Sequence, residues 1–260
     1  MLLSLVILGG SLVLNFLLFK RAKQYYVELN GTRLDPVGLN HYPTSTQSKS
    51  SQALIRVVLF GDSRSAAWPA PGLSDSPEKQ YEFINRGIGS QTSIQTLQRF
   101  SQHVQPLEPD VVLIQVGVND LKTVALFPEQ ADSIIAACKK NIQHIVTTTQ
   151  KTGAIAIVTT VFPVGEVPWE RQLFWSEDIS LAVQSVNAYI KTLASDRVLI
   201  FDAFSLLANE QQLLRPEYRI DELHLNAAGY TKLNQELTLL LTKLSTKTTP
   251  ASRKSVINQN

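Results

Sequence analysis

The chain has 260 residues, of which 44% are hydrophobic, a size and composition that suit one α/β domain with appendages. Its formal net charge of +2 is too small to indicate a nucleic-acid partner, and its basic residues form no patch interleaved with aromatic ones. The single cysteine, Cys138, excludes an internal disulfide and a thiolate metal site, and the apolar residues around it at helical spacing indicate a buried core thiol.

Residues 1–19 are almost continuously apolar, and this length is close to the ~17–25 residues that a helix needs to span a bilayer. Lys20, Arg21 and Lys23 follow at once. A secretory signal would carry its positive charge before the apolar run and a small-residue cleavage site after it. We therefore expect an uncleaved membrane anchor, with a cleaved signal peptide as the alternative.

The basic residues lie only on the C-terminal side of this segment, so the positive-inside rule predicts that the following domain is cytoplasmic. A periplasmic or other extracytoplasmic position is the alternative. Residues 20–52 are polar and contain proline, glycine and a Ser/Thr-rich run, which is typical of a juxtamembrane tether.

Residues 55–60 form a short apolar run rich in β-branched side chains, which is typical of a buried strand. The run ends at Gly61, which permits a sharp turn, and Asp62 and Ser63 then favour the start of a helix. A serine at such a turn is displayed at the carboxyl edge of a sheet, where α/β proteins bind ligands. A purely structural helix cap explains this stretch alone equally well. We expect a structural role for Asp62 and a solvated side chain for Arg64, with contact to an anionic substrate group as the alternative for Arg64.

Strands and helices alternate through the rest of the domain. Further strands are expected at residues 82–85, 110–116, 154–161 and 198–201, and helices at 92–104, 130–150 and 226–244. Strands separated by helices imply βαβ units. We therefore predict a three-layer α/β/α sandwich with a mostly parallel, flavodoxin-like sheet over residues 53–244, and a disordered tail over residues 245–260.

Polar residues follow several of these strands. A glycine-containing turn follows the strand at 82–85, Gly117-Val-Asn119-Asp follows the strand at 110–116, and Asp221-x-x-His224 precedes the last helix. Together with Gly-Asp-Ser63, these motifs resemble in order and residue type the SGNH (GDSL-type) hydrolase family, over roughly residues 55–244. The resemblance implies a serine esterase that needs no cofactor or metal and acts on a small-molecule, lipid or carbohydrate acyl ester.

The catalytic hypothesis follows from what a serine nucleophile requires. A serine hydroxyl is a weak nucleophile unless a base takes its proton. Among the four histidines, only His224 has a carboxylate three residues before it, and this spacing lets Asp221 reach the imidazole. Glu222 is a competing carboxylate, although a neighbouring residue does not easily face the same ring. We expect Ser63 as nucleophile, His224 as base and Asp221 as the residue that orients His224.

The oxyanion of an acyl-transfer intermediate needs hydrogen-bond donors. The candidates are the backbone N–H of Ser63, a backbone N–H in the Gly89-Ser90 turn and the side-chain amide of Asn119, for which a plain turn residue is the alternative. The family has a glycine where this chain has Ser90. A serine retains the backbone N–H, so the donor survives this departure from the family pattern.

Four aromatic residues are candidates for the wall of a substrate pocket. Trp169, Phe174 and Trp175 lie in an insertion after the strand at 154–161, which forms either a lid or acyl-binding wall or a helix packed on the sheet. Trp68, just past the nucleophile turn, is a further candidate for this wall.

Two other functional classes remain open from the sequence. Asp62, Asn119, Asp120, Asp221 and His224 offer hard oxygens and one imidazole for a metal-dependent phosphoesterase, although a single histidine is few for such a site. A catalytically silent, membrane-tethered binding module is the second, and the presence of all three triad residue types argues against it. The Gly-x-Ser-x-Gly signature of the classical α/β-hydrolases is absent around Ser63. Hydrolysis and acyl transfer both fit these motifs, and the motifs do not bear on the oligomeric state.

Overall fold

The computed structural model describes residues 2–43, 55–72 and 81–248. Contacts divide the chain into two compact units, Met1–Pro43 and Thr44–Asn260. The first unit is the helix α1 (Leu2–Leu34) followed by a turn in which the Asp35 carboxylate accepts hydrogen bonds from the backbone N–H groups of Leu39 and Asn40.

Within the described residues, α1 is the one helix long and apolar enough to cross a membrane, and none of its side chains is buried. The helix covers the expected anchor and continues past Phe19 to Leu34. The first part of the segment expected as a tether is therefore helical rather than irregular. The remainder of that segment, from Thr44 onward, lies outside the described residues.

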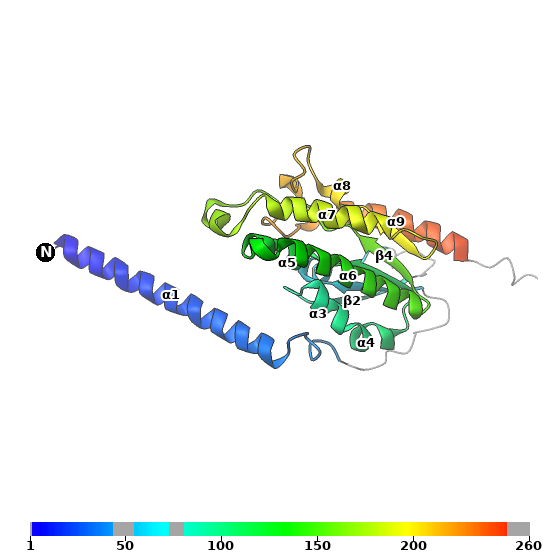
Figure 1. Ribbon diagram of the computed structural model, residues 1–260, viewed down its shortest axis with the longest axis horizontal. Helices are drawn as coiled ribbons and strands as arrows, with labels where there is room; N and C mark the ends of the chain where they lie inside the picture. The colour runs from blue at the N-terminus through cyan, green and yellow to red at the C-terminus, as the bar shows by residue number, and fades with distance from the viewer. Residues whose placement is uncertain (1, 44–54, 73–80, 249–260) are drawn as a thin grey trace, which may run out of the picture. The chain divides into compact units, whose positions relative to one another are not determined.

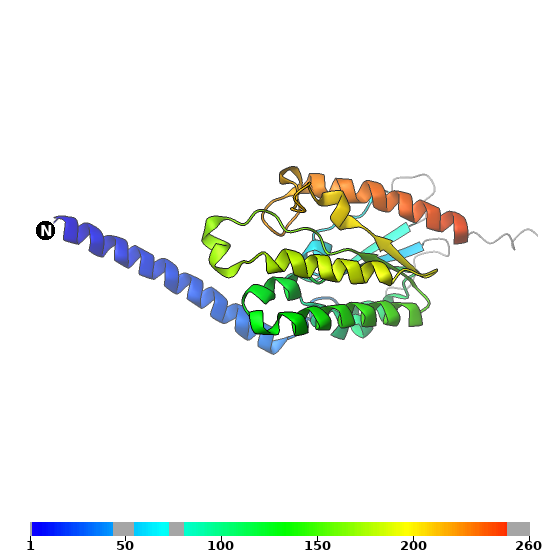
Figure 2. The ribbon, with the colours of Figure 1, turned by 45° about the horizontal axis from the view of Figure 1, so that its top comes forward.

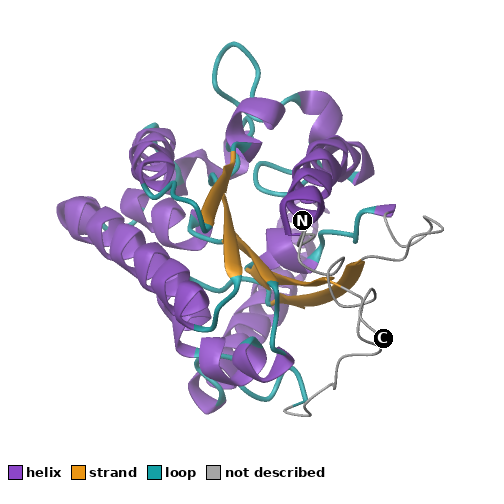
Figure 3. Cartoon of the chain, turned by 90° about the vertical axis from the view of Figure 1, so that its right-hand side faces the viewer, coloured by secondary structure: helices purple, strands orange, loops and turns teal. Residues whose placement is uncertain are grey.

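The described part of the second unit holds a five-stranded sheet in which every neighbouring pair is parallel. Its strands are β1 (Ile55–Gly61), β2 (Tyr81–Gly87), β3 (Val111–Gln115), β4 (Ile155–Thr159) and β5 (Val198–Phe201), in the order β2-β1-β3-β4-β5. All five predicted strands are present, with ends shifted by one or two residues at most positions. Figure 3 shows helices on both faces of this sheet, so the predicted α/β/α sandwich is confirmed.

The strands separate two hydrophobic cores because successive side chains of a strand point to opposite faces. Val58 and Phe60 belong to one core and Val57 and Leu59 to the other. The first core is covered by α3 (Ser93–Gln98), α4 (Phe100–His103), α6 (Ala131–Lys151) and α7 (Asp178–Thr192), and the second by α8 (Ala203–Leu207) and α9 (Ala227–Thr248). Figures 1 and 2 both show α6 and α7 side by side along the sheet. Cys138 is buried in the first core, as expected.

Short helical turns connect the larger elements. They are α2 (Ser63–Ala66), α5 (Val118–Leu121) and the 3-10 turns η2 (Gln105–Leu107), η3 (Lys122–Ala125), η4 (Pro128–Gln130), η5 (Trp169–Phe174) and η6 (Pro216–Tyr218). Most of them follow the carboxyl ends of strands, where they form the edge of the sheet that carries the candidate site.

Two helices differ from their predicted extents. The single helix expected at residues 92–104 is broken at Arg99, whose buried guanidinium donates to the backbone oxygens of Gly61 and Arg86 at 2.8 and 2.7 Å. The helix expected to end at residue 244 continues to Thr248. The expected tail therefore begins later, and residues 249–260 lie outside the described part of the chain.

The strand order creates a switch point between β1 and β3, because the chain leaves β1 toward β2 and then returns to the other side of β1. Ligands bind at such points in parallel sheets. Here the two strands approach so closely that a Cβ built on Gly61 would lie 1.7 Å from the backbone oxygen of Gln115. Only glycine fits at this position.

We predict that Gly61→Ala destabilises the second unit by about 4 kcal/mol or more, because the clash is with backbone that has no room to move. Gly72→Ala is the matched control, since nothing lies within 4 Å of a Cβ built there, and it should change the free energy of unfolding by less than about 0.5 kcal/mol. Denaturant titration of both variants measures the difference. Equal stabilities for the two would contradict the close approach of β1 and β3.

Candidate active site

The turn after β1 displays Ser63 as the first residue of α2. Asp62 caps this helix, with Oδ1 accepting the backbone N–H of Arg64 at 2.9 Å. The side chain of Asn85 on the neighbouring strand β2 donates to the backbone oxygen of Ser65 at 2.8 Å. Contacts from its own turn and from the adjacent strand therefore hold the turn that carries the serine. The helix cap is the kind of structural role that we expected for Asp62.

Ser63, His224 and Asp221 form a continuous hydrogen-bonded chain. Ser63 Oγ lies 3.0 Å from His224 Nε2, and His224 Nδ1 lies 3.0 and 2.9 Å from the two carboxylate oxygens of Asp221. The side chains of His224 and Asp221 are 38% and 39% exposed, so a substrate can reach them. The structure thus brings together the three side chains that the sequence singled out.

The Asp221 carboxylate is held in its ionised form. Burial acts to raise its pKa, but the hydrogen bonds from the His224 ring and from the backbone N–H groups of Leu223 and His224 outweigh burial and lower the pKa below its usual value. A carboxylate that stays charged fixes the imidazole orientation and stabilises the imidazolium when it forms.

Glu222, the competing carboxylate, faces another partner. Its side chain is 3% exposed and pairs with Arg171 on η5 rather than with the His224 ring. Its backbone oxygen accepts the N–H of Gly165 at 2.8 Å. The choice of Asp221 over Glu222 therefore agrees with the geometry.

The three candidate oxyanion donors lie on separate elements. A Cβ built on Gly89 would lie 4.0 Å from the Cβ of Ser63, so the glycine turn is beside the nucleophile. Ser90 has a φ of 62°, in the left-handed region that favours glycine, which explains why a glycine suits this position. The Asn119 amide donates to the backbone oxygen of Gln91 at 3.0 Å. An amide NH2 has two hydrogens, and this bond uses one.

Asp120 fastens the two donor segments together, a role that was not predicted from the sequence. Its carboxylate accepts the backbone N–H of Ser93 at 2.8 Å and the Ser93 hydroxyl at 2.6 Å. This joins α5, which carries Asn119, to the start of α3. Among the described residues, no group of three His, Cys, Asp or Glu side chains is placed to hold a metal ion.

The expectation for Arg64 was wrong. Its side chain is completely buried, and its guanidinium donates to the backbone oxygens of Leu223 at 2.8 Å and Phe162 at 3.3 Å. These partners lie 159 and 98 positions away, so no local sequence signal identified them. Through Leu223, Arg64 ties the nucleophile turn directly to the loop that carries His224.

Burial also changes the acidity of the charged pair at this turn. Burial raises the pKa of the Asp62 carboxyl to about 6, although the nearby charge of Arg64 opposes this change. Burial lowers the pKa of the Arg64 guanidinium, and the charge of Asp62 again opposes it. Both groups are therefore desolvated, and the charge of each favours the ionised form of the other.

The aromatic candidates do not form one wall. Trp68 is 2% exposed, packs near Phe162 and Tyr230 and donates from its indole nitrogen to Asn234 at 2.7 Å, so its assignment to a substrate wall was wrong and it is a core residue. Trp175 packs partly against the first core. Trp169 and Phe174 are 77% and 63% exposed on η5, which excludes a helix packed on the sheet.

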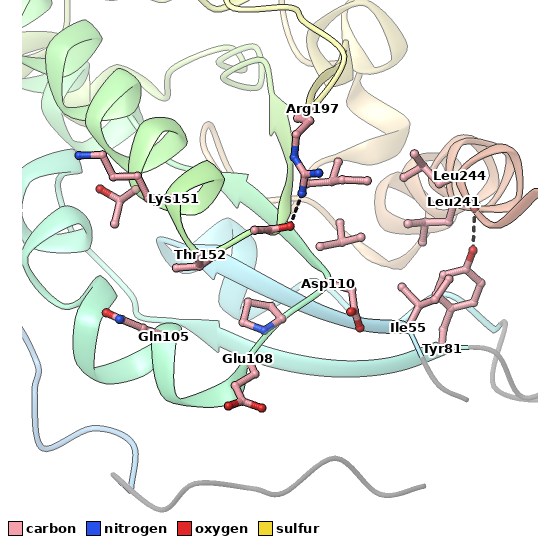
Figure 4. A pocket seen from close by; sticks show the side chains of 15 residues that line it. Ile55, Tyr81, Gln105, Glu108, Asp110, Lys151, Thr152, Arg197, Leu241 and Leu244 are labelled. Carbon is pink, nitrogen blue, oxygen red and sulfur yellow. Dashed lines mark hydrogen bonds between the residues drawn. The ribbon is translucent and has the colours of Figure 1, made fainter. Parts of the chain in front are cut away.

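A cavity of about 940 Å³ lies at the opposite edge of the sheet (Figure 4). Its lining includes the first residues of the strands β1 to β4: Ile55, Tyr81, Val111 and Ile155. Ser63 follows the other end of β1. Cavity size therefore does not identify the candidate site in this protein.

Replacing Arg64 tests the tie between the nucleophile turn and the histidine loop. Arg64→Gln leaves the buried backbone oxygens of Leu223 and Phe162 without their guanidinium donors, so we expect a loss of about 3 kcal/mol in the free energy of unfolding. We also expect faster amide exchange at Leu223 and His224. Arg215→Gln is the control, because that side chain is 44% exposed, and it should cost about 1 kcal/mol or less. Unchanged exchange at Leu223 in Arg64→Gln would contradict the tie.

Comparison with known proteins identifies the family of the chain. Residues 46–232 match the GDSL-like Lipase/Acylhydrolase family. No match was found among curated proteins. Similar solved structures include a protein from Bacteroides fragilis, provisionally described as an acylhydrolase, which is 25% identical with a TM-score of 0.63 over 77% of this chain and 93% of that chain.

Two further structures share the fold. A GDSL-like lipase from Bacteroides thetaiotaomicron is 24% identical with a TM-score of 0.65, over 80% of this chain and 98% of that chain. The acetyl xylan esterase AlAXEase is 23% identical with a TM-score of 0.56, over 72% of this chain and 100% of that chain. The family match covers most of the chain and includes Ser63, Asp221 and His224. The chain therefore belongs to the GDSL-like lipase/acylhydrolase family, as the resemblance in its motifs implied.

Proposed function

We propose that this protein is a serine esterase whose nucleophile is Ser63, with His224 as general base and Asp221 as the residue that orients it. The observation that carries the proposal is the hydrogen-bonded chain from Ser63 Oγ through the His224 ring to the Asp221 carboxylate. Membership of an acylhydrolase family supports ester chemistry at this site.

In the first half of the reaction, Ser63 Oγ attacks the ester carbonyl while His224 Nε2 takes its proton. The negative charge that develops on the carbonyl oxygen is stabilised by the N–H of Ser63, by a backbone N–H of the Gly89-Ser90 turn and by the second amide hydrogen of Asn119. His224 then returns the proton to the departing alcohol, which leaves an acyl-serine.

In the second half, a water or another hydroxyl attacks the acyl-serine by the same steps in reverse. Water gives hydrolysis, and the hydroxyl of a second substrate gives acyl transfer. No step requires a metal ion or a cofactor. A lipid or carbohydrate acyl ester is the proposed substrate class, supported by similar structures described as a lipase and as acetyl xylan or acetyl-xylooligosaccharide esterases.

We also propose that α1 is an uncleaved membrane anchor. Its length and apolar composition support this role, and the basic residues that follow the apolar run favour a cytoplasmic position for the second unit. A cleaved signal sequence would instead place the second unit outside the cytoplasm. The mass of the N-terminal peptide of the mature protein distinguishes the two.

Replacement of Ser63 tests the nucleophile. Ser63→Ala should abolish turnover of p-nitrophenyl acetate, a loss of about 10³-fold or more, because no acyl-serine can form. The wild-type rate should not change when a chelator is added. Ser205→Ala is the control and should retain full activity. It alters an exposed serine on α8, which follows the outermost strand β5.

Two outcomes of this assay would reject the proposal. Turnover that survives in Ser63→Ala would exclude this nucleophile, and loss of wild-type turnover on chelation would favour the metal-dependent phosphoesterase. A well-folded wild type without activity on esters of any chain length would favour the silent binding module.

The pH dependence of turnover tests the base. We expect kcat/KM to fall as the pH is lowered from 8 to 5, the range in which imidazoles change charge, because a protonated ring cannot accept the Ser63 proton. Asp221 stays ionised in this range because its pKa is lowered, so it adds nothing to the profile. Asp62 has a pKa of about 6 and titrates in the same range.

Asp62→Asn is therefore the control for the pH profile. The decline on the acid side should persist in this variant if His224 is the base. A flat profile in the wild type, or a decline that disappears in Asp62→Asn, would show that protonation of His224 does not limit the reaction.

A further inference from the structure

Large apolar side chains that face solvent gather at the edge of the sheet that carries Ser63. In the described part of the second unit, eight large hydrophobic side chains are at least half exposed, and six of them lie on turns at this edge. We call these six the apolar rim: Leu126, Phe127, Trp169, Leu173, Phe174 and Ile220. The other two, Leu181 and Leu239, lie on the outer surfaces of α7 and α9.

Rim residues lie on segments that contact or adjoin the candidate site. Ile220 adjoins Asp221 in the chain, and Arg171 on η5 pairs with Glu222 in the same loop. Leu126 and Phe127 follow η3, which begins with Lys122. This lysine lies close enough to Asp62 and Glu222 for their charges to act on its pKa. Figures 1 and 2 both show α5 and the turn after β4 at the same end of the second unit.

The exposure of these side chains is too high for a substrate pocket. Trp169, Leu173 and Ile220 are 77%, 87% and 72% exposed. A group of exposed large apolar side chains next to an active site usually marks a contact with another apolar phase or molecule. A pocket wall would instead be partly buried by its neighbours.

The charges around η5 give this segment no electrostatic attraction to an anionic partner. Between positions 162 and 178 the charged residues are four acids and one base: Glu166, Glu170, Glu177, Asp178 and Arg171. Contact must therefore come from the apolar and aromatic side chains. Tryptophan and phenylalanine beside aliphatic residues suit the interface of a lipid bilayer, where apolar rings meet polar headgroups.

The helix α1 indicates that the apolar phase near the rim is a membrane. α1 is apolar enough to cross a membrane and none of its side chains is buried. A unit linked to a membrane-spanning helix stays at a high effective concentration at the bilayer surface, so even a few inserted side chains suffice for docking.

We propose that the apolar rim inserts into the interface of a lipid bilayer, so that the site at Ser63 opens onto the membrane. The consequence that an acyl ester enters from the bilayer rests on the proposed function, whereas docking itself does not. The surface is a neutral lipid interface, because the acidic residues around η5 gain nothing from anionic lipids.

The tryptophans of the full chain provide the probe. α1 holds none, Trp68 is buried and Trp175 is partly buried, so Trp169 is the tryptophan placed to enter a bilayer. The full-length protein is reconstituted in phosphatidylcholine vesicles whose acyl chains carry bromine, which quenches nearby tryptophan fluorescence. We expect quenching relative to unbrominated vesicles, and we expect Trp169→Phe to remove most of it.

Two matched substitutions test whether bilayer insertion depends on the rim or on any exposed leucine. Leu173→Asp should lose most of the quenching of Trp169, because a carboxylate on η5 opposes insertion. Leu239→Asp is the control, since Leu239 is 57% exposed on α9 and away from the rim, and it should keep the full quenching. Raising the salt concentration should leave the quenching unchanged.

The proposal is overturned if the wild-type tryptophan fluorescence is equal in brominated and unbrominated vesicles. It is also overturned if bromine quenches the fluorescence of Leu173→Asp as strongly as that of the wild type. Trp169 that is shielded from aqueous acrylamide but not quenched by brominated lipid would also overturn it, because a second copy of the chain would then cover the rim.

Turnover of water-soluble p-nitrophenyl acetate is measured in the same preparations and separates this proposal from the proposed function. Quenching without turnover would leave docking intact and reject the esterase. Turnover without quenching would reject docking alone.

Discussion

The hydrogen bond between Ser63 Oγ and His224 Nε2 joins side chains that are 161 positions apart in the chain. Buried contacts on each side hold these two side chains within reach of one another. On the serine side, Gly61 lets β1 approach β3 closely enough to fix the start of α2. On the histidine side, the buried guanidinium of Arg64 holds the backbone of Leu223, next to His224. Reactions of this kind are sensitive to displacements of about 1 Å, so these buried contacts matter as much as the reacting groups.

Much of this arrangement is predictable from local sequence. A β-branched apolar run predicts a buried strand, and strands separated by amphipathic segments predict a parallel sheet with helices on both faces. The polar residues that end such strands then meet at one edge. Residue type and spacing make Ser63, Asn119 and the pair Asp221 and His224 candidates, and the resemblance of their motifs to the SGNH (GDSL-type) hydrolases singles them out.

The features that the sequence did not predict depend on distant partners. Arg64 was expected in solvent, but its hydrogen-bond acceptors lie on loops that only the fold brings near. Trp68 was expected beside the substrate, but the rings that bury it come from β4, β5 and α9 regions of the chain. Arg99 breaks a helix that its periodicity favoured, because its side chain turns inward to the carbonyls at the ends of β1 and β2.

The central claim is that His224 activates Ser63 as a nucleophile, and covalent labelling tests it most directly. The full chain is treated with a fluorophosphonate, which reacts with serines activated by a base, and the modified residue is mapped by mass spectrometry. The account predicts a single modified residue, Ser63, and little labelling in His224→Ala. Ester turnover by protein in which Ser63 stays unmodified, or labelling of Ser63 that is unchanged in His224→Ala, would contradict it.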